Sequence, residues 1–526
     1  MYDVLLKNGL VIDGTGEKPF YADVAVENGR IAAIAPHISQ GLAAETVDVT
    51  GLCVIPGIID IHSHSDLSYI RDDRCEAKLY QGVTSELCGQ CGSTPYPCLP
   101  ENKARIARYG NTVKGNFAAC SFENYVRGVQ DRGDKMSVNL MPLVGHCTLR
   151  SGVMEYSRRL ATSDEIKQMR ALLRADMEAG AWGLSLGLGY EPSKSADGEE
   201  LCLLGQEIAP YDGIIPVHLR NQGADTPQSL EEIFEINRRT GAHVHIAHFK
   251  VSHAVAHGRA PEFVQIVRAA QKAGVHVTVD MYPYTAATSR LTRKFPEWSL
   301  QGGAQKAVQI LKGPERAKLV SALEDIYRTA AHGDSLRIVS TYGVIPGSDG
   351  KSLRQISEMW GVSQGEALAR ITTETDARCR CVAFCMCESD VDHMMSQNDF
   401  SIGSDGSALS FGPALVDGKP HPRNYGTFPR FLRLAREKKI CPPEIAVRRI
   451  TGLSADSIGI KDRGYLREGL VADIAVINME TVADRATYED PFQKPEGVIH
   501  VLMDGQFALR NGVQTEKRLG KILMKR

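Results

Sequence analysis

Two hydrophobic patterns divide the chain into a central region and two similar ends. Residues 1–55 form short runs in which apolar and polar positions alternate, such as YDVLLKNGLVIDG and ADVAVENGRIAAIA. Asn-Gly pairs at 8–9 and 28–29 lie between such runs, which is typical of β-hairpins. ADIAVINME and GVIHVLMDGQFALRNG repeat this style near the C-terminus. Because the ends of a domain often lie close together, we expect one small β-sandwich domain built from 1–56 and 460–526.

In the central region, short apolar runs alternate with segments of helical period. Eight of the runs are candidate strands: 54–63, 83–89, 137–145, 182–187, 213–219, 243–249, 275–282 and 400–405. Between most of them lie helical patterns such as 163–180, which has acidic residues in its first turn and ends at Gly180. This alternation predicts an α/β fold, a (β/α)8 TIM-type barrel over 57–459. Residues 286–398 are too many for one crossover, and we interpret them as an insertion over the barrel mouth.

Size and charge narrow the class of protein. A length of 526 residues, 43% of them hydrophobic, suits a large barrel with insertions and a satellite domain. The net charge of −2 comes without any basic run, so we expect a small-molecule substrate and no nucleic-acid partner. No signal-peptide pattern and no apolar run of about 18 residues occurs, so we expect a cytoplasmic protein with no membrane span. The 13 cysteines are then expected to be reduced. The sequence leaves the oligomeric state open.

The strongest local signal for chemistry is the His-x-His pair in IIDIHSHSD. Residues two apart on a strand face the same way, so His62 and His64 lie on one side and Ile59 and Ile61 on the other. Two imidazoles placed this way can chelate one metal ion. Two surface histidines at a strand end are the alternative, but the flanking apolar run favours a buried metal site.

Cysteines give a second signal after the next strand. Cys88 and Cys91 form a C-x-x-C in LCGQCGS, which is compatible with a redox pair or with two buried thiols. A zinc ribbon requires a second such pair at suitable spacing, which is missing. One thiolate that joins histidines in a catalytic zinc site is also chemically sound. The cluster CRCVAFCMC at 379–387 fits no standard metal spacing, and we interpret it as a buried apolar segment.

Three further candidates lie near the ends of apolar strands, where barrel enzymes build their active sites. His218 ends IIPVHLRNQ and His248 ends VHIAHFK, although a single strand histidine is more often a hydrogen-bonded core residue. Spacing alone does not separate His248 from His243 and His245. Asp405 in SIGSDGS can bind a metal and act as a general base, and an Asp-Gly turn is compatible with that role.

Taken together, these motifs resemble the N-acyl-D-amino-acid deacylases of the amidohydrolase superfamily over nearly the whole chain. The matching segments include VIPGIIDIHSHSD, CGQCG, GLSLGLGYEP, VHLRN, AHFK, DMYPYTA, GSDG, HPRNYGTFPRFL and the closing RGYLREGLVADIAVINMETVADRATYEDP. The His-x-His pair is evidence only for the superfamily, whereas the cysteine context, HPRNYGTFPR and the closing segment are more specific. The resemblance implies zinc-dependent hydrolysis of N-acyl-D-amino acids to a carboxylate and a free D-amino acid.

The resemblance also implies a role for individual positions. Six of them match the metal centre, with Asp405 as the catalytic aspartate: His62, His64, Cys91, His218, His248 and Asp405. We hypothesise a tightly bound zinc ion on Cys91, His218 and His248, and a second, weaker metal on the His-x-His pair.

Substrate-contacting positions follow from the same resemblance. Tyr190, Lys250, Tyr282 and Arg423 lie in matching motifs. YPYTAATSRL is one residue shorter than expected, so the arginine for the substrate carboxylate is Arg290 or Arg293. Gln90 and Gln222 stand where the family pattern has Asn and Glu, a departure that bears on side-chain specificity.

Three other functions compete with the deacylase. A cyclic-amide hydrolase resembling hydantoinases or dihydroorotases needs a carboxylated lysine at the end of the fourth strand, but WGLSLGLGYEP offers no lysine before Lys194. Cys91 supplies an anionic ligand in its place. A barrel that has lost catalysis would have lost metal ligands, which this chain retains. A deaminase finds no support in these motifs.

Overall fold

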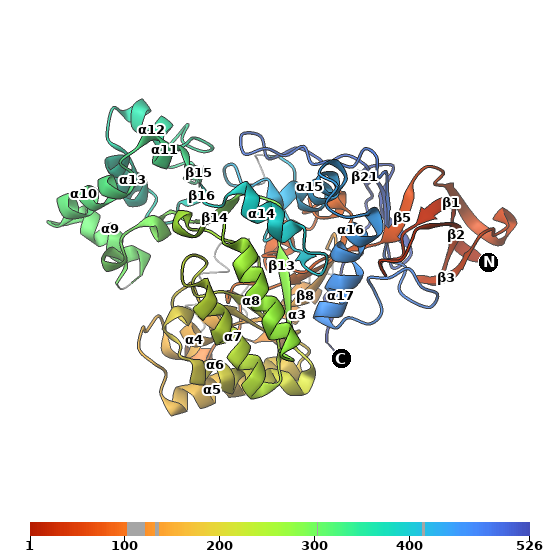
Figure 1. Ribbon diagram of the computed structural model, residues 1–526, viewed down its shortest axis with the longest axis horizontal. Coiled ribbons are helices and arrows are strands. Elements are labelled where there is room, and N and C mark those ends of the chain that lie inside the picture. Colours follow the sequence, from red (N-terminus) through yellow and green to blue (C-terminus); the bar gives the residue numbers. More distant parts are fainter. Residues whose placement is uncertain (103–120, 132–135, 302, 413–415, 526) are drawn as a thin grey trace.

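The computed structural model describes residues 1–102, 121–131, 136–301, 303–412 and 416–525. A sheet of nine strands takes strands from both ends of the chain, in the order β21-β20-β19-β18-β5-β1-β2-β3 with β4 on β1. The strands are β1 (Tyr2–Val11), β2 (Phe20–Glu27), β3 (Arg30–Ala35), β4 (Ala43–Asp48), β5 (Cys53–Pro56), β18 (Ile474–Ile477), β19 (Val498–Met503), β20 (Gln506–Arg510) and β21 (Val513–Gln514). β5 pairs antiparallel with β18, so the red N-terminal strands and the blue C-terminal segment lie side by side (Figure 1).

The two N-terminal Asn-Gly pairs have different structures. Asn28 and Gly29 both have positive φ, 51° and 75°, and form the tight turn between β2 and β3. The hairpin prediction is wrong at Asn8, which lies inside β1 at a register shift, with φ of 63°. Its backbone N–H donates to the carboxylate of Asp23 at 2.8 Å. The pair therefore makes a β-bulge, because a side-chain acceptor satisfies the backbone group that leaves the ladder.

A (β/α)8 barrel, as predicted, forms the centre of the molecule. Its eight strands among the described residues run parallel to their neighbours: β6 (Ile58–Asp60), β7 (Val83–Cys88), β8 (Asn139–Pro142) continued by β9 (Val144–Gly145), β10 (Leu184–Gly187), β11 (Ile214–His218), β12 (His243–Ile246), β13 (Val277–Met281) and β17 (Ser401–Ile402). A parallel bridge between Ser63 and Gly406 closes the last strand onto the first. The carboxyl ends of all eight strands therefore meet at one rim.

Helices surround these strands and bury their apolar faces. They are α1 (Ser68–Arg71), α3 (Phe122–Gln130), α4 (His146–Met154), α5 (Ser163–Glu178), α6 (Gly198–Ile208), α7 (Thr226–Thr240), α8 (Ala260–Lys272), α14 (Glu388–Met395), α15 (Arg423–Glu437), α16 (Pro443–Ile450) and α17 (Gly452–Ile458). α5 begins at the predicted residue 163 and ends at Glu178, two residues before the predicted end. Thr162 and Glu165 form a capping box at its start, and Gly180 follows its end with φ of 100°. None of the described helices is long and apolar enough to cross a membrane.

The insertion has its own sheet and core and projects from one side of the barrel (Figure 1). β14 (Ala286–Arg290), β15 (Leu336–Ser340) and β16 (Arg380–Phe384) form an antiparallel sheet in the order β14-β16-β15. Its helices are α9 (Ala304–Lys312), α10 (Arg316–Ile326), α11 (Ala330–Asp334), α12 (Leu353–Trp360) and α13 (Gln364–Glu374). Cys379 and Cys381 are fully buried in this core, whereas Cys385 and Cys387, in the second half of the predicted buried segment, are only half-buried.

The end of the inserted sheet lies before the predicted residue 398. Asp390 in α14 accepts hydrogen bonds from the backbone of Gly258 at 2.8 Å and of Ala260 at 3.0 Å, at the start of α8. α14 is therefore a barrel helix. The start of the insertion contacts the loop after β10, since Lys194 pairs with Glu297 at 3.0 Å.

The C-terminal tail leaves the small β-domain and packs against the barrel. Leu140 of β8 donates to the carbonyl of Lys521 at 3.0 Å and accepts from the backbone of Leu523 at 2.8 Å. The indole of Trp182 donates to the carbonyl of Leu523 at 2.6 Å. The tail thus adds backbone pairing beside a barrel strand.

Candidate metal centre

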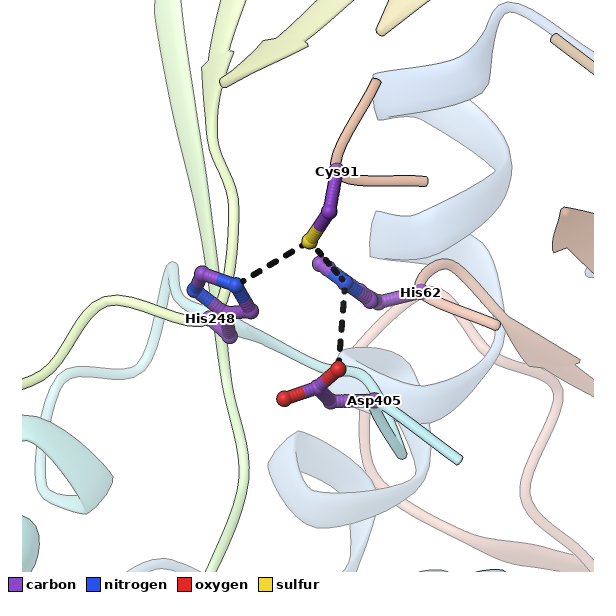
Figure 2. Close-up of side chains that lie close together, drawn as sticks. All are labelled: His62, Cys91, His248 and Asp405. Carbon is purple, nitrogen blue, oxygen red and sulfur yellow. Dashed lines mark hydrogen bonds and ion pairs between the residues drawn. The ribbon is translucent and has the colours of Figure 1, made fainter. Parts of the chain in front are cut away.

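Four side chains from distant parts of the chain converge at the carboxyl rim of the barrel. His62 follows β6, Cys91 follows β7, His248 follows β12 and Asp405 follows β17. Each offers one ligand atom, and these atoms all lie within 4.8 Å of one another. All four residues are buried, and Figure 2 shows their side chains pointing toward a common centre. The barrel closure brings them together, because every strand ends at this rim.

The other two predicted metal-centre histidines flank this group. His218, at the end of β11, has its Nδ1 atom 2.8 Å from His248 Nε2 and 3.7 Å from Cys91 Sγ. His64 places Nε2 3.0 Å from Asp405 Oδ1. Cys91 Sγ is central, at 3.3 Å from His248 Nε2 and 3.7 Å from His62 Nε2. The structure therefore brings all six predicted positions to one place.

Three of the converging residues have a backbone conformation that L-residues rarely adopt. The φ angles are 56° at Cys91, 39° at His248 and 49° at Asp405. A left-handed conformation costs roughly 1–2 kcal/mol for such residues. Backbone hydrogen bonds hold two of them in place, because His248 N donates to Asp280 Oδ1 and Asp405 N to the carbonyl of His62, both at 2.9 Å. Strain of this kind is concentrated at functional sites.

Electrostatics distinguish the two cysteines of the C-x-x-C motif. Burial alone would raise the pKa of the Cys91 thiol, but His248, His218 and His62 lower that pKa well below its ordinary value. Burial raises the pKa of Cys88 well above the ordinary value, and Cys88 belongs to the hydrophobic core. Both thiols are free. The arrangement therefore favours a single thiolate ligand over a redox pair.

Asp405 is ionised although it is buried. Burial would raise the pKa of its carboxyl group, but the charge of Arg423 and the histidines lowers that pKa well below its usual range. Arg423 Nη1 donates to Asp405 Oδ2 at 2.7 Å. Oδ1 faces His64, and it lies 3.6 Å from His62 Nε2. A charged carboxylate beside the cluster is able to accept a proton or bind a cation.

The predicted substrate-contacting residues mostly lie around the same rim. Lys250 Nζ lies 5.2 Å from the centre of the Tyr282 ring, and burial lowers the pKa of this lysine. The guanidinium of Arg423 lies 5.3 Å from the same ring. The Tyr190 ring lies 4.4 Å from that of His218. The buried hydroxyl of Tyr282 has no hydrogen-bond partner among the described residues.

The prediction for Arg290 does not match the structure. Arg290 is exposed on β14 opposite Arg380 of β16, which directs it to solvent at the edge of the inserted sheet. Arg293 lies in the next turn, with its guanidinium 3.9 Å from the centre of the Tyr190 ring and Nη2 donating to the carbonyl of Gly189 at 2.9 Å. Of the two arginines, Arg293 is the one beside the site. β14 ends at Arg290, and the chain turns toward the barrel only after this residue, so Arg293 reaches the site and Arg290 does not.

Sequence analysis missed two charged residues that support the site. Asp280, fully buried at the end of β13, contacts His62 Nδ1 at 3.2 Å. An acidic residue inside the apolar run VHVTVDMY was the available signal. Lys78 is also fully buried, between Asp60 and Glu86, and donates to the hydroxyl of Ser404 at 2.7 Å. Its segment, EAKLYQG, carries no comparable signal.

The donor set fits a zinc ion. A thiolate, several imidazoles and a carboxylate are the ligands that zinc prefers. Bond lengths of about 2.3 Å to sulfur and about 2.0 Å to nitrogen place tetrahedral S and N ligands roughly 3.5 Å apart. The observed distances of 3.3, 3.7 and 3.7 Å from Cys91 Sγ to the histidines bracket this value.

Comparisons with known proteins find similar proteins along nearly the whole chain. The family model described as "Amidohydrolase family" matches residues 45–325 and 414–508. D-aminoacylase of Alcaligenes xylosoxydans xylosoxydans is 32% identical over 523 residues, which are 99% of this chain and 97% of that protein.

Solved structures extend the likeness to three dimensions. N-acyl-D-glutamate deacylase of Bordetella bronchiseptica, crystallised with zinc and a phosphonate mimic of the tetrahedral intermediate, has a TM-score of 0.83 at 31% identity, covering 99% of each chain. A D-aminoacylase whose binuclear metal centre was studied has a TM-score of 0.83 at 30% identity over the full length of both chains. An L-hydantoinase of Arthrobacter aurescens, at 16% identity, a TM-score of 0.58 and full coverage of both chains, shares the fold alone.

Proposed function

The chain belongs to the amidohydrolase family, and we propose that it is a zinc-dependent deacylase of N-acyl-D-amino acids. The reaction releases a carboxylate and a free D-amino acid. One observation carries this proposal: a buried thiolate, Cys91, lies within bonding geometry of histidines and beside the ionised Asp405. Its full-length relatives include D-aminoacylase and N-acyl-D-glutamate deacylase.

Cys91, His218 and His248 would hold the tight zinc ion in this proposal. The short distances among their ligand atoms support this grouping, 3.7 Å and 3.3 Å from Sγ to the two rings. His62 and His64, with Asp405 between them, would hold a second, weaker metal ion. When bound, zinc supplies Lewis acidity, which acidifies water and polarises the amide carbonyl.

Asp405 takes the proton of the attacking water and later delivers it to the departing amine. Two features suit it to this role. Its carboxylate is ionised before the reaction begins, because of the charge of Arg423 and the nearby histidines. Arg423 and His64 occupy its two oxygens from either side at 2.7 and 3.0 Å, so the group is held at the rim without rotating. General acid–base catalysis of this kind contributes about 10²–10⁴-fold.

Cationic side chains at the rim bind the substrate carboxylate. Lys250 is buried without a described hydrogen-bond partner, and burial lowers its pKa, so an anionic ligand would stabilise its charged form. Lys250 Nζ lies over the Tyr282 ring, and the guanidinium of Arg293 lies over the Tyr190 ring. Anchoring the carboxylate at one end orients the amide at the other.

The environment of the lysine after the fourth strand argues against the cyclic-amide hydrolase. Lys194 is exposed and pairs with Glu297 at 3.0 Å. It therefore does not serve as a bridging ligand at the rim. We also propose a cytoplasmic location, supported by free thiols among the described residues, such as those of Cys53, Cys202 and Cys441.

A substrate panel with metal analysis tests the function. Purified enzyme is assayed with N-acetyl and N-formyl derivatives of D- and L-amino acids, and with hydantoin and dihydroorotate, while zinc per chain is measured by mass spectrometry. We expect amino-acid release from D-derivatives and at least one tightly bound zinc ion. Turnover confined to the cyclic amides would establish the rival function. Zinc-replete enzyme that hydrolyses none of the acyl-D-amino acids would overturn the proposal.

A further inference from the structure

A chain of hydrogen bonds leads away from the metal centre through the interior of the barrel. His62 Nδ1 contacts Asp280 Oδ2 at 3.2 Å, and the same oxygen lies 2.9 Å from His245 Nε2. His245 Nδ1 lies 2.7 Å from the hydroxyl of Thr278, which also contacts His243 Nε2 at 2.8 Å. His245 and Asp280 are fully buried, and neither forms part of the cluster of candidate ligands.

The strand register creates this chain. β12 and β13 run parallel, with His245 paired to Thr278. Residues two apart share a face, so His243 and His245 lie together on β12 and Thr278 and Asp280 on β13. Each polar side chain on one strand therefore meets one on the other, and the row ends at the ring of His62.

The chemistry of the partners fixes the direction of every hydrogen bond. Asp280 Oδ2 lies 3.2 Å from His62 Nδ1 and 2.9 Å from His245 Nε2, and its Oδ1 accepts the backbone N–H of His248; a carboxylate can only accept. Both His62 Nδ1 and His245 Nε2 must therefore carry the proton and donate to it. His62 Nε2 is then the lone-pair nitrogen, and this atom faces Cys91 and Asp405. His245 Nδ1 correspondingly accepts from the hydroxyl of Thr278.

Asp280 also controls a second candidate ligand. Its Oδ1 atom accepts the backbone N–H of His248 at 2.9 Å, where φ is 39°. One carboxylate thus orients the ring of His62 and holds the strained backbone of His248. Asp280 itself is oriented from the barrel interior only by His245, among the side chains that the structure describes.

We infer that His245 is a positioning residue for hydrolysis: through Nε2 it holds Asp280, and Asp280 fixes His62 and His248 in the metal centre. The inference rests on the proposed function, since it takes these histidines as metal ligands. Outer partners of ligating histidines typically change metal affinity by about 10–100-fold when they are lost.

Two amide variants distinguish the role of His245 Nε2 from that of His245 Nδ1. In His245→Gln the longer side chain places its amide near Nε2 and keeps a donor to Asp280. In His245→Asn the shorter amide reaches only the position of Nδ1, near Thr278, and the donor to Asp280 is lost. His243→Asn makes the same change two residues away on the same face, and it serves as the matched control.

The zinc dissociation constant of each apoprotein is measured by competition with a chromogenic chelator. We expect His245→Asn to raise it about 10–100-fold, and His245→Gln and His243→Asn to stay within about threefold of wild type. The visible spectrum of the cobalt-substituted protein should change in the Asn variant alone, since only there is the geometry of His62 released. Equal dissociation constants for the Asn and Gln variants would overturn the inference.

A third variant covers the case in which the histidine changes prevent folding. Thr278→Val is nearly isosteric and removes the hydroxyl that fixes the tautomer of His245, so a smaller rise in the dissociation constant is expected. Wild-type affinity in this variant would also overturn the inference. Wild-type protein without tight zinc would overturn the proposed function and this inference with it. Tight zinc binding in wild type, together with unchanged zinc affinity in the variants, would refute this inference but leave the proposed function standing.

Discussion

At the scale of single residues, position at the rim decides the chemistry of otherwise identical side chains. Cys88 and Cys91 are both buried, yet the pKa of one thiol is raised and that of the other is lowered. Cys88 ends a strand and faces apolar neighbours, whereas Cys91 lies three residues later among histidines. Burial penalises the thiolate at both positions, and only nearby hydrogen-bond donors and positive charge reverse the effect.

Replacing Cys91 with serine should remove the tightly bound metal. A hydroxyl is not a thiolate at neutral pH, so the zinc dissociation constant should rise more than about 100-fold, because the only anionic sulfur donor of the cluster is lost. Zinc per chain after dialysis measures this. Cys88→Ala is the matched control and should keep wild-type zinc, with a modest fall in melting temperature. Loss of zinc in both variants would favour a paired role for the two cysteines.

Asp405→Asn should separate catalysis from metal binding. The amide keeps the size of the side chain but accepts no proton, so kcat should fall about 10²–10⁴-fold. Zinc content should remain near wild type, because Cys91, His218 and His248 are unchanged. Asp325→Asn, at an exposed carboxylate that pairs with Arg328, provides a control with the same chemical change. A variant of Asp405 that keeps more than a tenth of wild-type kcat would contradict the assignment of the base.

At the scale of secondary-structure elements, buried charges fasten helices and strands to one another. Lys78 precedes β7 and reaches Asp60 of β6, Glu86 of β7 and Ser404 beyond β17. It therefore joins the two strands that close the barrel, at the point where His62 and Asp405 must meet. A buried cation of this kind is stable only because carboxylates pair with it.

Asp176 in α5 makes the attachment of α3 depend on pH. It accepts the backbone N–H of Phe122 at 3.0 Å with one oxygen, and the other has no partner among the described residues. Burial raises the pKa of this carboxyl group to about 7. The unfolded pKa is about 3.9, so only the folded state holds the proton between these values. Stability from this group is therefore present at low pH and is lost as pH rises from about 4 through 7.

Asp176→Asn should remove this pH dependence, since the amide keeps the acceptor for Phe122 and cannot ionise. At pH 8 the variant should be more stable than wild type by roughly 4 kcal/mol at most, at about 1.4 kcal/mol per pKa unit. The difference should shrink steadily toward pH 5. Denaturant unfolding at several pH values measures it. A difference that does not vary with pH would show that Asp176 is ionised, or protonated, equally in both states.

At the scale of the whole molecule, the two chain ends stabilise regions far from each other in sequence. β18 completes the N-terminal sheet, and the last described residues continue along the barrel beside β8. The tail makes backbone hydrogen bonds from Gly520 to Met136, between Leu140 and residues 521 and 523, and from Lys525 to Gly180. The barrel therefore depends on residues that a local pattern assigns to another domain.

Deleting residues 519–526 should destabilise the barrel without changing its chemistry. Four backbone hydrogen bonds at about 1 kcal/mol each amount to roughly 4 kcal/mol. The melting temperature should fall, whereas kcat at 25 °C should stay within about twofold, because the described tail residues bond to the backbone of Met136, Leu140 and Gly180, none of which is a candidate ligand. Lys517→Ala, an exposed change just before the deletion, should leave both unchanged. A deletion that lowers kcat at a temperature where the protein is folded would refute this view of the tail.

Much of the fold and the candidate site followed from local pattern. The alternation of apolar and polar residues and the helical period of apolar residues are set within a few residues of the chain. Apolar runs such as 243–249 and 275–282 therefore predicted strands correctly, and α5 began at its predicted acidic turn. The strand ends then carried the polar residues His62, Cys91 and Asp405, which the barrel topology was expected to gather at one rim. Resemblance to a family supplied their roles.

Only the tertiary structure decided between neighbours with the same local pattern. His243, His245 and His248 share one short segment, and the end of β12 at Ile246 sends His248 alone to the cluster while His245 supports it from within. Arg290 ends a strand at the surface, and Arg293 reaches Tyr190. The physical reason is that these outcomes depend on strand register, on the closure of the barrel between Ser63 and Gly406, and on partners hundreds of residues away. A hydrophobic pattern spans only a few residues and carries no information about such long-range contacts.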